Sequence, residues 1–191
     1  MTLIKPVFYD TDCLECFLFV DAGHILEKLF TKIVIPEQVY AELMDDNTPP
    51  IVKTNFKKLK EGFVETREIP FMSQEYTTYN LIKKSFWSQT GKCCGDGESA
   101  AMALAHLNNG IVASNNLSDV EEYIESLDIE LLTSSMILSK AVEKNIVSEN
   151  AANGLWKGMI KEGIDLPKNS FNEYYDELYE SDCERFLKGE R

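Results

Sequence analysis

Polar residues that could bind a metal ion follow the apolar segments of this 191-residue chain. They occur in four separate segments, at Asp10 and Asp12, at Glu42, at Asp96 and Glu98, and at Asn115, Asn116 and Asp119. Carboxylates a few ångströms apart cannot all ionise without a cation, and their hard oxygen atoms suit Mg²⁺ or Mn²⁺. A metal ion at such a site polarises a phosphodiester and supplies hydroxide, so hydrolysis needs no side-chain nucleophile. These residue types predict metal-dependent hydrolysis if the fold brings the four segments together.

The apolar pattern predicts an α/β fold that would do so. Short apolar runs typical of buried strands lie at 7–9, 32–35, 62–66, 111–113 and 129–132. Apolar residues at helical spacing lie over 13–30, as one or two helices, and over 36–43, 51–60, 73–86, 98–107, 116–124, 133–143, 148–160 and 171–187. Strands that alternate with helices in short steps form a parallel sheet covered on both faces, and sites in such sheets lie at the carboxyl ends of the strands. Since Asp10, Asp12 and Asn115 each follow a predicted strand, we expect the polar residues to converge at that edge.

Composition limits the class of protein. With 44% hydrophobic residues the chain can bury a core, and its length fits one domain with a short appendage. We expect a domain at residues 1–165 and an acidic helical extension at 166–191 that packs on it. The sequence lacks a membrane span or a secretion signal, which predicts a cytoplasmic protein with no membrane partner. The five cysteines are then reduced thiols.

The net charge of −13 argues against a nucleic-acid partner, because an acidic surface repels phosphate backbones. The repulsion matters less if the acids surround a cation or lie elsewhere, and seven of them fall in residues 171–191. Candidate RNA contacts are lysines and aromatic residues at helical spacing: Lys53, Lys57 and Lys60 on one predicted helix, and Lys83, Lys84, Phe86 and Trp87 on another. A solvated lysine face and ordinary core packing are the simpler interpretations of these residues.

Three ordered blocks of the sequence resemble the PIN-domain family. Residues 7–14, VFYDTDCL, are similar to the opening of that family, in which an apolar strand ends in Asp-Thr. Residues 33–43, IVIPEQVYAEL, carry a strand, Pro, Val and Glu in the family's order. Residues 95–105, GDGESAAMALA, resemble the Gly-x-Gly-Glu block of one PIN branch, whose Glu stands where other branches have Asp. The resemblance covers roughly residues 5–145.

The resemblance implies a Rossmann-like α/β/α sandwich with a five-stranded, mainly parallel sheet and a C-terminal helical extension. It also implies a metal-dependent endoribonuclease, often the toxin of a bacterial toxin–antitoxin pair. Carried over to this chain, Asp10, Glu42 and Glu98 would be the catalytic acids that bind Mg²⁺ or Mn²⁺. RNA would be the substrate, and an antitoxin protein and a second copy of the chain would be further partners.

The fourth block departs from the family pattern, in which a strand and Thr or Ser precede Asp. Asn115 and Asn116 stand there, and their side-chain carbonyl oxygens are neutral ligands. Asp119, one helical turn later, could replace the missing acid. The metal ligands would then include Asn116 and Asp119, while Asp12, Asp96 and Asn115 would support the ligands. Without the fourth acid the chain could instead be a non-catalytic binding or regulatory module, and this alternative stays open.

Two other chemistries compete with this interpretation. The stretch Asp10-Thr11-Asp12 also resembles the Asp-x-Asp of haloacid-dehalogenase-like phosphotransferases, but Leu14 and Asn115 stand where that family has other residues. The thiols of Cys13, Cys16, Cys93 and Cys94 could hold zinc, but adjacent cysteines make an awkward pair of ligands. A single acid can also be a helix cap or a surface charge, and this reading fits Asp96 best.

Overall fold

The computed structural model describes residues 5–90 and 94–188, with the side chains of residues 5–85 and 94–188. A five-stranded sheet has the order β3-β2-β1-β4-β5, and every neighbouring pair is parallel. The strands are β1 (Val7–Tyr9), β2 (Ile33–Pro36), β3 (Val64–Arg67), β4 (Ile111–Ala113) and β5 (Glu130–Leu132). Phe8 in the central strand lies opposite Val34 on one side and Val112 on the other. The predicted parallel α/β fold is confirmed, and all five strands end at one edge.

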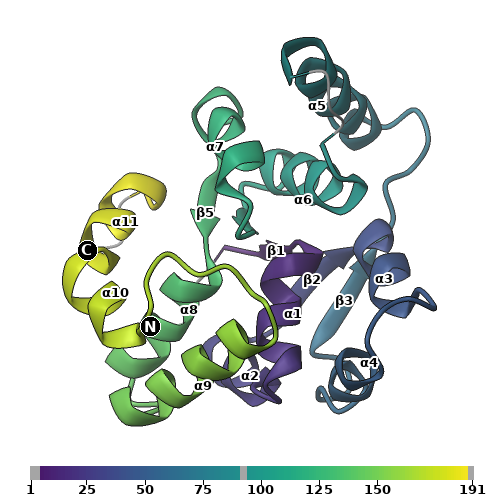
Figure 1. The fold of residues 1–191 in the computed structure, drawn as a ribbon. Helices are drawn as coiled ribbons and strands as arrows, with labels where there is room; N and C mark the ends of the chain where they lie inside the picture. The colour runs from purple at the N-terminus through teal and green to yellow at the C-terminus, as the bar shows by residue number, and fades with distance from the viewer. Residues whose placement is uncertain (1–4, 91–93, 189–191) are drawn as a thin grey trace.

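Helices cover both faces of the sheet (Figure 1). The chain continues from β1 into α1 (Thr11–Phe19) and α2 (Gly23–Leu29), and from β2 into α3 (Glu37–Met44) and α4 (Pro50–Phe56). The remaining helices are α5 (Gln74–Thr90), α6 (Asp96–Leu107), α7 (Leu117–Ser126), α8 (Ser134–Glu143), α9 (Glu149–Lys161), α10 (Phe171–Glu177) and α11 (Tyr179–Phe186). In Figure 1, α6 and α7 lie on one side of the sheet and α1, α2, α8 and α9 on the other. Helix α3 packs against both α1 and α6, so it joins the two layers beside the carboxyl edge.

Small side chains bring α6 close to the sheet. Ala100, Ala101 and Ala103 are fully buried, and the helix contacts β1, β2 and β4. Gly110, just before β4, approaches so closely that an added Cβ would lie 2.6 Å from the Phe8 ring. The close packing holds the first turn of α6 next to the end of β1.

Two helices end earlier than the sequence predicts. The helix expected over 51–60 ends at Phe56, where the Asn55 amide donates to Leu18 O at 2.7 Å and the next residues form tight turns. Lys57 is the C-cap of this helix, and its N–H still bonds to Lys53 O one turn earlier, whereas Lys60 lies beyond the helix. The prediction that all three lysines share one helical face was therefore wrong for Lys60. The helix expected over 171–187 breaks at Leu178, so that α10 packs on α9 while α11 turns towards β5. The apolar stripe over 13–30 forms two helices, α1 and α2.

The C-terminal helices pack on the domain through aromatic rings. Trp156 on α9 stacks on Tyr174 with ring centroids 5.5 Å apart, and Tyr175 stacks on Tyr179 at 5.5 Å. Farther along the chain, Lys188 N donates to Glu130 Oε1 at 2.5 Å. Among the described residues, no helix combines the length and the apolar character that crossing a membrane requires.

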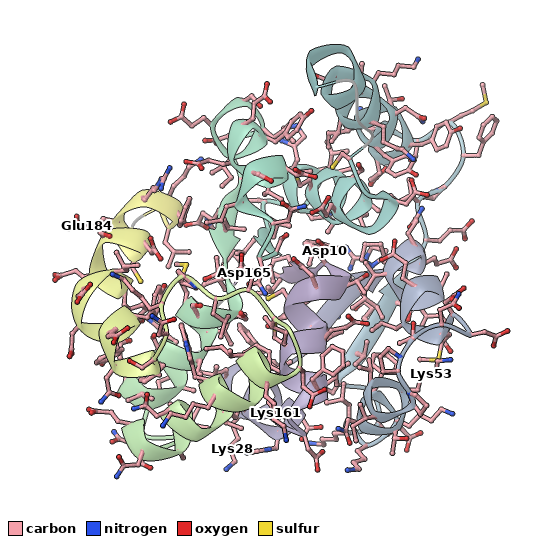
Figure 2. The ribbon with its side chains drawn as sticks, in the orientation of Figure 1. Asp10, Lys28, Lys53, Lys161, Asp165 and Glu184 are labelled. Carbon is pink, nitrogen blue, oxygen red and sulfur yellow. The ribbon has the colours of Figure 1, made fainter. Side chains whose placement is uncertain are left out.

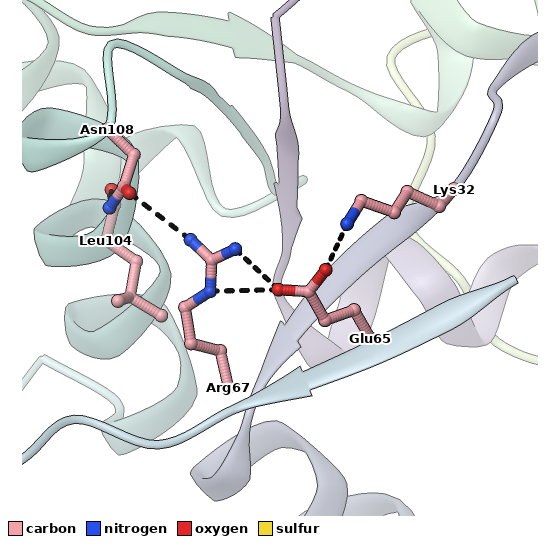
Figure 3. A network of polar contacts seen from close by, with 5 residues as sticks. All are labelled: Lys32, Glu65, Arg67, Leu104 and Asn108. Carbon is pink, nitrogen blue, oxygen red and sulfur yellow. Dashed lines mark hydrogen bonds and ion pairs between the residues drawn. The ribbon is translucent and has the colours of Figure 1, made fainter. Parts of the chain in front are cut away.

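Charged side chains cover the edge strand β3. Glu65 contacts the Lys32 ammonium and accepts from Arg67 Nη2 at 2.5 Å, and Arg67 Nη1 donates to Asn108 Oδ1 at 3.3 Å (Figure 3). The Arg67 guanidinium also lies 5.3 Å from the centre of the Phe8 ring. Charges on an exposed edge strand oppose pairing with another chain, so this network protects the open side of the sheet.

Candidate functional site

A hollow of about 270 Å³ opens at the carboxyl edge of the sheet. Its lining comes from segments far apart in the sequence: Asp10, Thr11, Asp12 and Glu15, then Glu42, then Gly95, Gly97 and Glu98, and finally Asn116. The four segments that the sequence marks as polar thus converge, as the parallel sheet requires. Of the residues predicted to bind metal, Asp119 does not line the hollow.

Asp10 is both a helix cap and a buried acid of this hollow. It follows β1 directly, and its Oδ1 accepts from Thr11 N at 2.6 Å at the start of α1. Its Oδ2 accepts from the Ser114 hydroxyl, just after β4, at 3.2 Å. Only 4% of the residue is exposed. Capping α1 and lining the hollow are therefore compatible roles for Asp10, since the conformation that begins α1 also points the carboxylate into the hollow.

Burial raises the pKa values of acids in the hollow, and at Asp10 the charges of neighbouring acids add to this effect. The pKa of Asp10 is raised well above its usual value, mainly by burial and then by the negative charges of Asp12, Glu98 and Glu42. Burial also raises the pKa of Asp12, although the Asn115 main-chain N–H donates to its carboxylate at 3.3 Å and lowers it. None of the ion pairs between described residues involves these acids. The cluster therefore carries negative charge that the described side chains leave uncompensated.

Glycine at position 97 lets two of the carboxylates approach one point. A Cβ at Gly97 would lie 3.0 Å from Glu42 Oε2 and 3.1 Å from Asp10 Oδ1. The Thr11 hydroxyl donates to the same oxygen of Glu42 and fixes its position. Strand β1 and helix α3 thus each deliver one carboxylate oxygen to the first turn of α6.

Glu98 reaches the hollow from that first turn. Its Oε2 accepts from Gly95 N at 3.2 Å and from the Cys94 thiol at 3.5 Å. Burial raises its pKa first and the nearby charge of Asp119 second, while the Asn116 side chain lowers it. Asp119 accepts from the Ser118 hydroxyl at 2.9 Å, so it acts on the cluster through its charge rather than from the lining.

Asn115 and Asn116 have different surroundings. Asn116 lines the hollow. The Asn115 side chain turns away, with Nδ2 donating to Cys16 Sγ at 3.0 Å and Oδ1 accepting from Ser134 N at 2.9 Å. Asn115 therefore ties α1 to the start of α8 and supports Asp12 through its main chain.

Asp96 faces another way than the sequence interpretation supposed. Its carboxylate forms an ion pair with Lys83 and accepts from the Tyr79 hydroxyl at 3.0 Å, both on α5. The hydrogen bond from Lys83 is the main cause that lowers the pKa of Asp96. Residues two apart on a helix point about 200° from each other, so Glu98 faces the hollow while Asp96 faces α5.

Glu15 and two hydroxyl groups belong to the site but were missed in the sequence. Glu15 lines the hollow one turn into α1, and burial raises its pKa. Its spacing of four from Thr11 was the available signal, since such residues share a helix face. The Thr11 hydroxyl orients Glu42, and the Ser114 hydroxyl orients Asp10. Thr11 directly follows Asp10, and Ser114 directly follows the end of β4.

Three of the candidate RNA contacts, Lys53, Lys57 and Lys60, lie towards the other edge of the sheet. Lys58 pairs with Asp21 at 3.0 Å, and Asp21 follows the end of α1, whose first residue adjoins Asp10. A nine-residue helix spans about 13 Å, so the segment 57–60 is remote from the acids. Figure 2 likewise shows Lys53, on α4, well apart from Asp10. The side chains of Phe86 and Trp87 lie outside the described residues.

The described thiols that could have held zinc have other surroundings. Cys13 and Cys16 lie on the buried face of α1, Cys94 contacts Glu98, and Cys93 lies outside the described residues. Across the described ranges, no three His, Cys, Asp or Glu side chains are grouped tightly enough to form a ready-made metal site. The thiols are best explained as small apolar side chains.

The acids of the hollow nevertheless suit a hydrated Mg²⁺ or Mn²⁺. Mg²⁺ usually keeps several waters and binds through one or two carboxylates, so three tightly grouped acids are not required. The lining offers carboxylate and amide oxygens, which are hard ligands, and its charge is uncompensated. A hollow of about 270 Å³ has room for an ion with its water.

Comparison with known proteins agrees with this arrangement. A family model described as a PIN domain matches residues 6–180, which extends past the three sequence blocks, through α10 and to the start of α11. Among curated proteins, none matches the chain significantly. PIN domains are generally nucleases, and their fold is the parallel α/β/α arrangement found here. The chain belongs to the PIN-domain family.

Proposed function

We propose that this protein is a metal-dependent endoribonuclease that cleaves RNA phosphodiesters at the acidic hollow. The observation that supports it most is the set of uncompensated carboxylates around one hollow: buried Asp10 after β1, half-buried Glu42 on α3 and buried Glu98 on α6. Such a cluster is costly for a fold to keep unless a cation occupies it. In this proposal Mg²⁺ or Mn²⁺ is the cofactor and RNA is the substrate.

In this proposal three acids hold the ion. Asp10 and Glu42 present their oxygens beside Gly97, and Glu98 approaches from the same turn of α6. Asn116 adds an amide oxygen at the rim, and Asp119 adds negative charge behind Glu98. The bound ion would polarise the phosphodiester and activate water.

The residues around these acids keep them in position. Ser114 and Thr11 donate hydroxyl hydrogens to Asp10 and Glu42, and the Asn115 main chain holds Asp12. Glu15 and Asp12 lie at the rim, where a carboxylate can accept a proton from water. The arrangement therefore provides positioning and charge, with the nucleophile drawn from solvent.

A toxin role is the biological setting that the family resemblance favours. The strongly acidic surface, with a net charge of −13, suits a basic segment of an antitoxin partner. Cell growth that stops when the chain is expressed, and resumes when Asp10→Asn is expressed instead, would support this setting.

The second candidate is a binding module without catalytic activity. It is favoured by Asn115, which replaces the fourth acid and turns its side chain towards Cys16 and Ser134. In that case the chain would bind RNA or a protein without cleaving it, and Mn²⁺ would not bind at millimolar concentration.

Cleavage of a fluorescent single-stranded RNA separates the two candidates. We expect cleavage with Mg²⁺ or Mn²⁺, no cleavage with EDTA, and a loss of about a hundredfold or more in Asp10→Asn, because a metal ligand supplies several kcal/mol to the transition state. Asp176→Asn on α10, an exposed acid far from the hollow, is the matched control. Calorimetry with Mn²⁺ should show binding that Glu98→Gln weakens. Equal cleavage by Asp10→Asn and by the control would overturn the assignment.

A further inference from the structure

We propose that single-stranded RNA reaches the hollow along α5, on a strip of aromatic rings and lysines. This strip, the α5 ladder, consists of Phe71, Tyr76, Tyr79, Lys83 and Lys84. The inference rests on the proposed function, because it names the form of RNA that the same site takes and the path by which it arrives.

The rings of the ladder stand in a continuous row. The Phe71 and Tyr76 ring centroids are 5.0 Å apart, and those of Tyr76 and Tyr79 are 6.5 Å apart. The Lys83 ammonium lies 5.4 Å from the Tyr79 ring. Phe71, at the outer end, is 74% exposed, which is unusual for a large apolar side chain. Unpaired bases stack on such rings, and a ladder of rings binds single strands with little sequence preference.

The inner end of the ladder meets the acidic hollow. Tyr79 and Lys83 both contact Asp96, which is two residues before Glu98 in the first turn of α6. The first turn of α6 therefore points Asp96 towards the ladder and Glu98 into the hollow. Figure 1 shows α5 standing out from the body beyond α6, and Phe71, just before this helix, is 74% exposed.

The local charge of this strip suits a phosphate backbone. Residues 69–85 contain one acid, Glu75, and two lysines, whereas the whole chain has a net charge of −13. Lys83 pairs with Asp96, so Lys84 is the lysine of this strip that would meet a phosphate. Lys84 is exposed and takes part in none of the ion pairs between described residues. It lines a shallow hollow of about 370 Å³ together with Tyr76, Thr77, Asn80 and Leu81. A ring, an amide and a cation in one hollow are the groups that bind a base and its phosphate.

A second copy of the chain is the main competing occupant of this surface. Met72 and Leu81 are 82% and 61% exposed, and they would suit an apolar interface. Lys84, Asn80 and Thr77 interrupt that apolar surface, and the path leads to an acid of the nuclease site. These features favour RNA, and the test below treats dimer formation as an outcome that would contradict the proposal.

Binding of a labelled RNA measures the ladder directly. The probe is a fluorescent single-stranded 12-nucleotide RNA, titrated with the full chain in EDTA at low salt and followed by anisotropy. We expect Phe71→Ala with Lys84→Ala to weaken binding at least about tenfold, as loss of one stacked base and one phosphate contact should. Adding Tyr76→Leu to this variant should weaken RNA binding further, and leucine keeps the apolar packing of this half-buried residue. A duplex of the same sequence should bind no better to the wild type than to the variant.

The matched control removes an aromatic ring and a lysine from a separate hollow, beside the start of β3. Tyr40 is 43% exposed and lines a hollow with Lys57 and Lys60. We expect Tyr40→Ala with Lys57→Ala to leave RNA affinity within twofold of the wild type. Equal binding by wild type and the Phe71/Lys84 variant, or equal loss in the control, would overturn the proposal. A wild type that sediments as a dimer, with the Phe71/Lys84 variant a monomer, would also overturn it.

Kinetics separate the failure of this inference from the failure of the proposed function. The Phe71/Lys84 variant should show a KM raised about tenfold and an unchanged kcat, since neither residue lines the acidic hollow. A wild type that binds RNA through the ladder but never cleaves it contradicts only the proposed function. Cleavage by the variant with the wild-type KM contradicts only the ladder.

Discussion

The two edges of the sheet manage acidic side chains in opposite ways. At the carboxyl edge, Asp10 is buried among other carboxylates, which raises its pKa. Towards the amino edge, Lys58 pairs with Asp21, and Glu65 contacts Lys32, so that hydrogen bonds from its basic neighbours lower the pKa of Glu65. Acids towards the amino edge are neutralised by basic side chains, whereas the acids that line the hollow at the carboxyl edge lack such partners among the described residues. The difference indicates where the fold gives up stability for function.

The largest effect should come from closing the space between the carboxylates. In Gly97→Ala the new Cβ would lie within 3.1 Å of oxygens of both Asp10 and Glu42, so one of them must move. We expect initial rates of RNA cleavage with Mn²⁺ to fall about a hundredfold, the usual cost of a displacement near 1 Å at reacting groups.

Gly154→Ala on α9 is the matched control for this change. No atom lies within 4 Å of the position that a Cβ would take there, and alanine in a helix interior is more stable than glycine by about 0.5–1 kcal/mol. The control should cleave normally and melt at a slightly higher temperature. Normal cleavage by Gly97→Ala would show that Asp10 and Glu42 do not act together.

A smaller loss should follow from removing a donor to Asp10. The Ser114 hydroxyl donates to Asp10 Oδ2 at 3.2 Å, and its loss in Ser114→Ala raises the pKa of Asp10 further. We expect cleavage at pH 7 to fall about tenfold, the value of one hydrogen bond to a charged group. The pH profile of cleavage should shift to higher pH, and Ser114→Thr, which keeps the hydroxyl, should restore it. A rate loss with an unshifted profile would assign Ser114 a packing role.

The smallest effects should appear in the pH dependence of stability, with opposite signs at the two edges. A carboxyl with a raised pKa adds stability below its unfolded pKa of about 4, and this stability is lost as the pH rises through its folded pKa. A carboxyl with a lowered pKa, such as Glu65, adds stability above that unfolded value and loses it as the pH falls.

Thermal unfolding in EDTA between pH 3 and pH 8 checks these signs. Asp10→Asn should gain stability relative to the wild type as the pH rises, whereas Glu65→Gln should lose it. Mn²⁺ should raise the melting temperature of the wild type at pH 7 and have less effect on Asp10→Asn. If both variants changed stability in the same direction with pH, the proposed contrast between the two edges would be wrong.

Much of this fold could be predicted because its strands and helices have strong local signals. The apolar runs at 7–9 and 111–113 and the alternation with helices were sufficient for the parallel sheet. Helix ends were less predictable, since α4 ends at Phe56 where Asn55 bonds to Leu18, a contact between residues 37 apart in the chain. Local periodicity contains no information about such a contact.

The candidate site was predictable to the level of segments. Asp10, Glu42 and Glu98 meet at one hollow because parallel strands end at one edge. Asp96 and Asn115 were placed with them by proximity in sequence, but each turns to other partners. The orientation of a side chain depends on neighbours that the chain brings from elsewhere.

By itself the sequence determined the family, the parallel sheet and which acids could meet, because apolar periodicity and residue type are local properties. Only the tertiary structure decided which acids are uncompensated and where the cations lie. Lys58 lies near Asp21 and Lys83 near Asp96, and neither pairing follows from spacing along the chain. The physical reason is that pKa values and charge pairing depend on distances through space, which packing sets after the chain has folded.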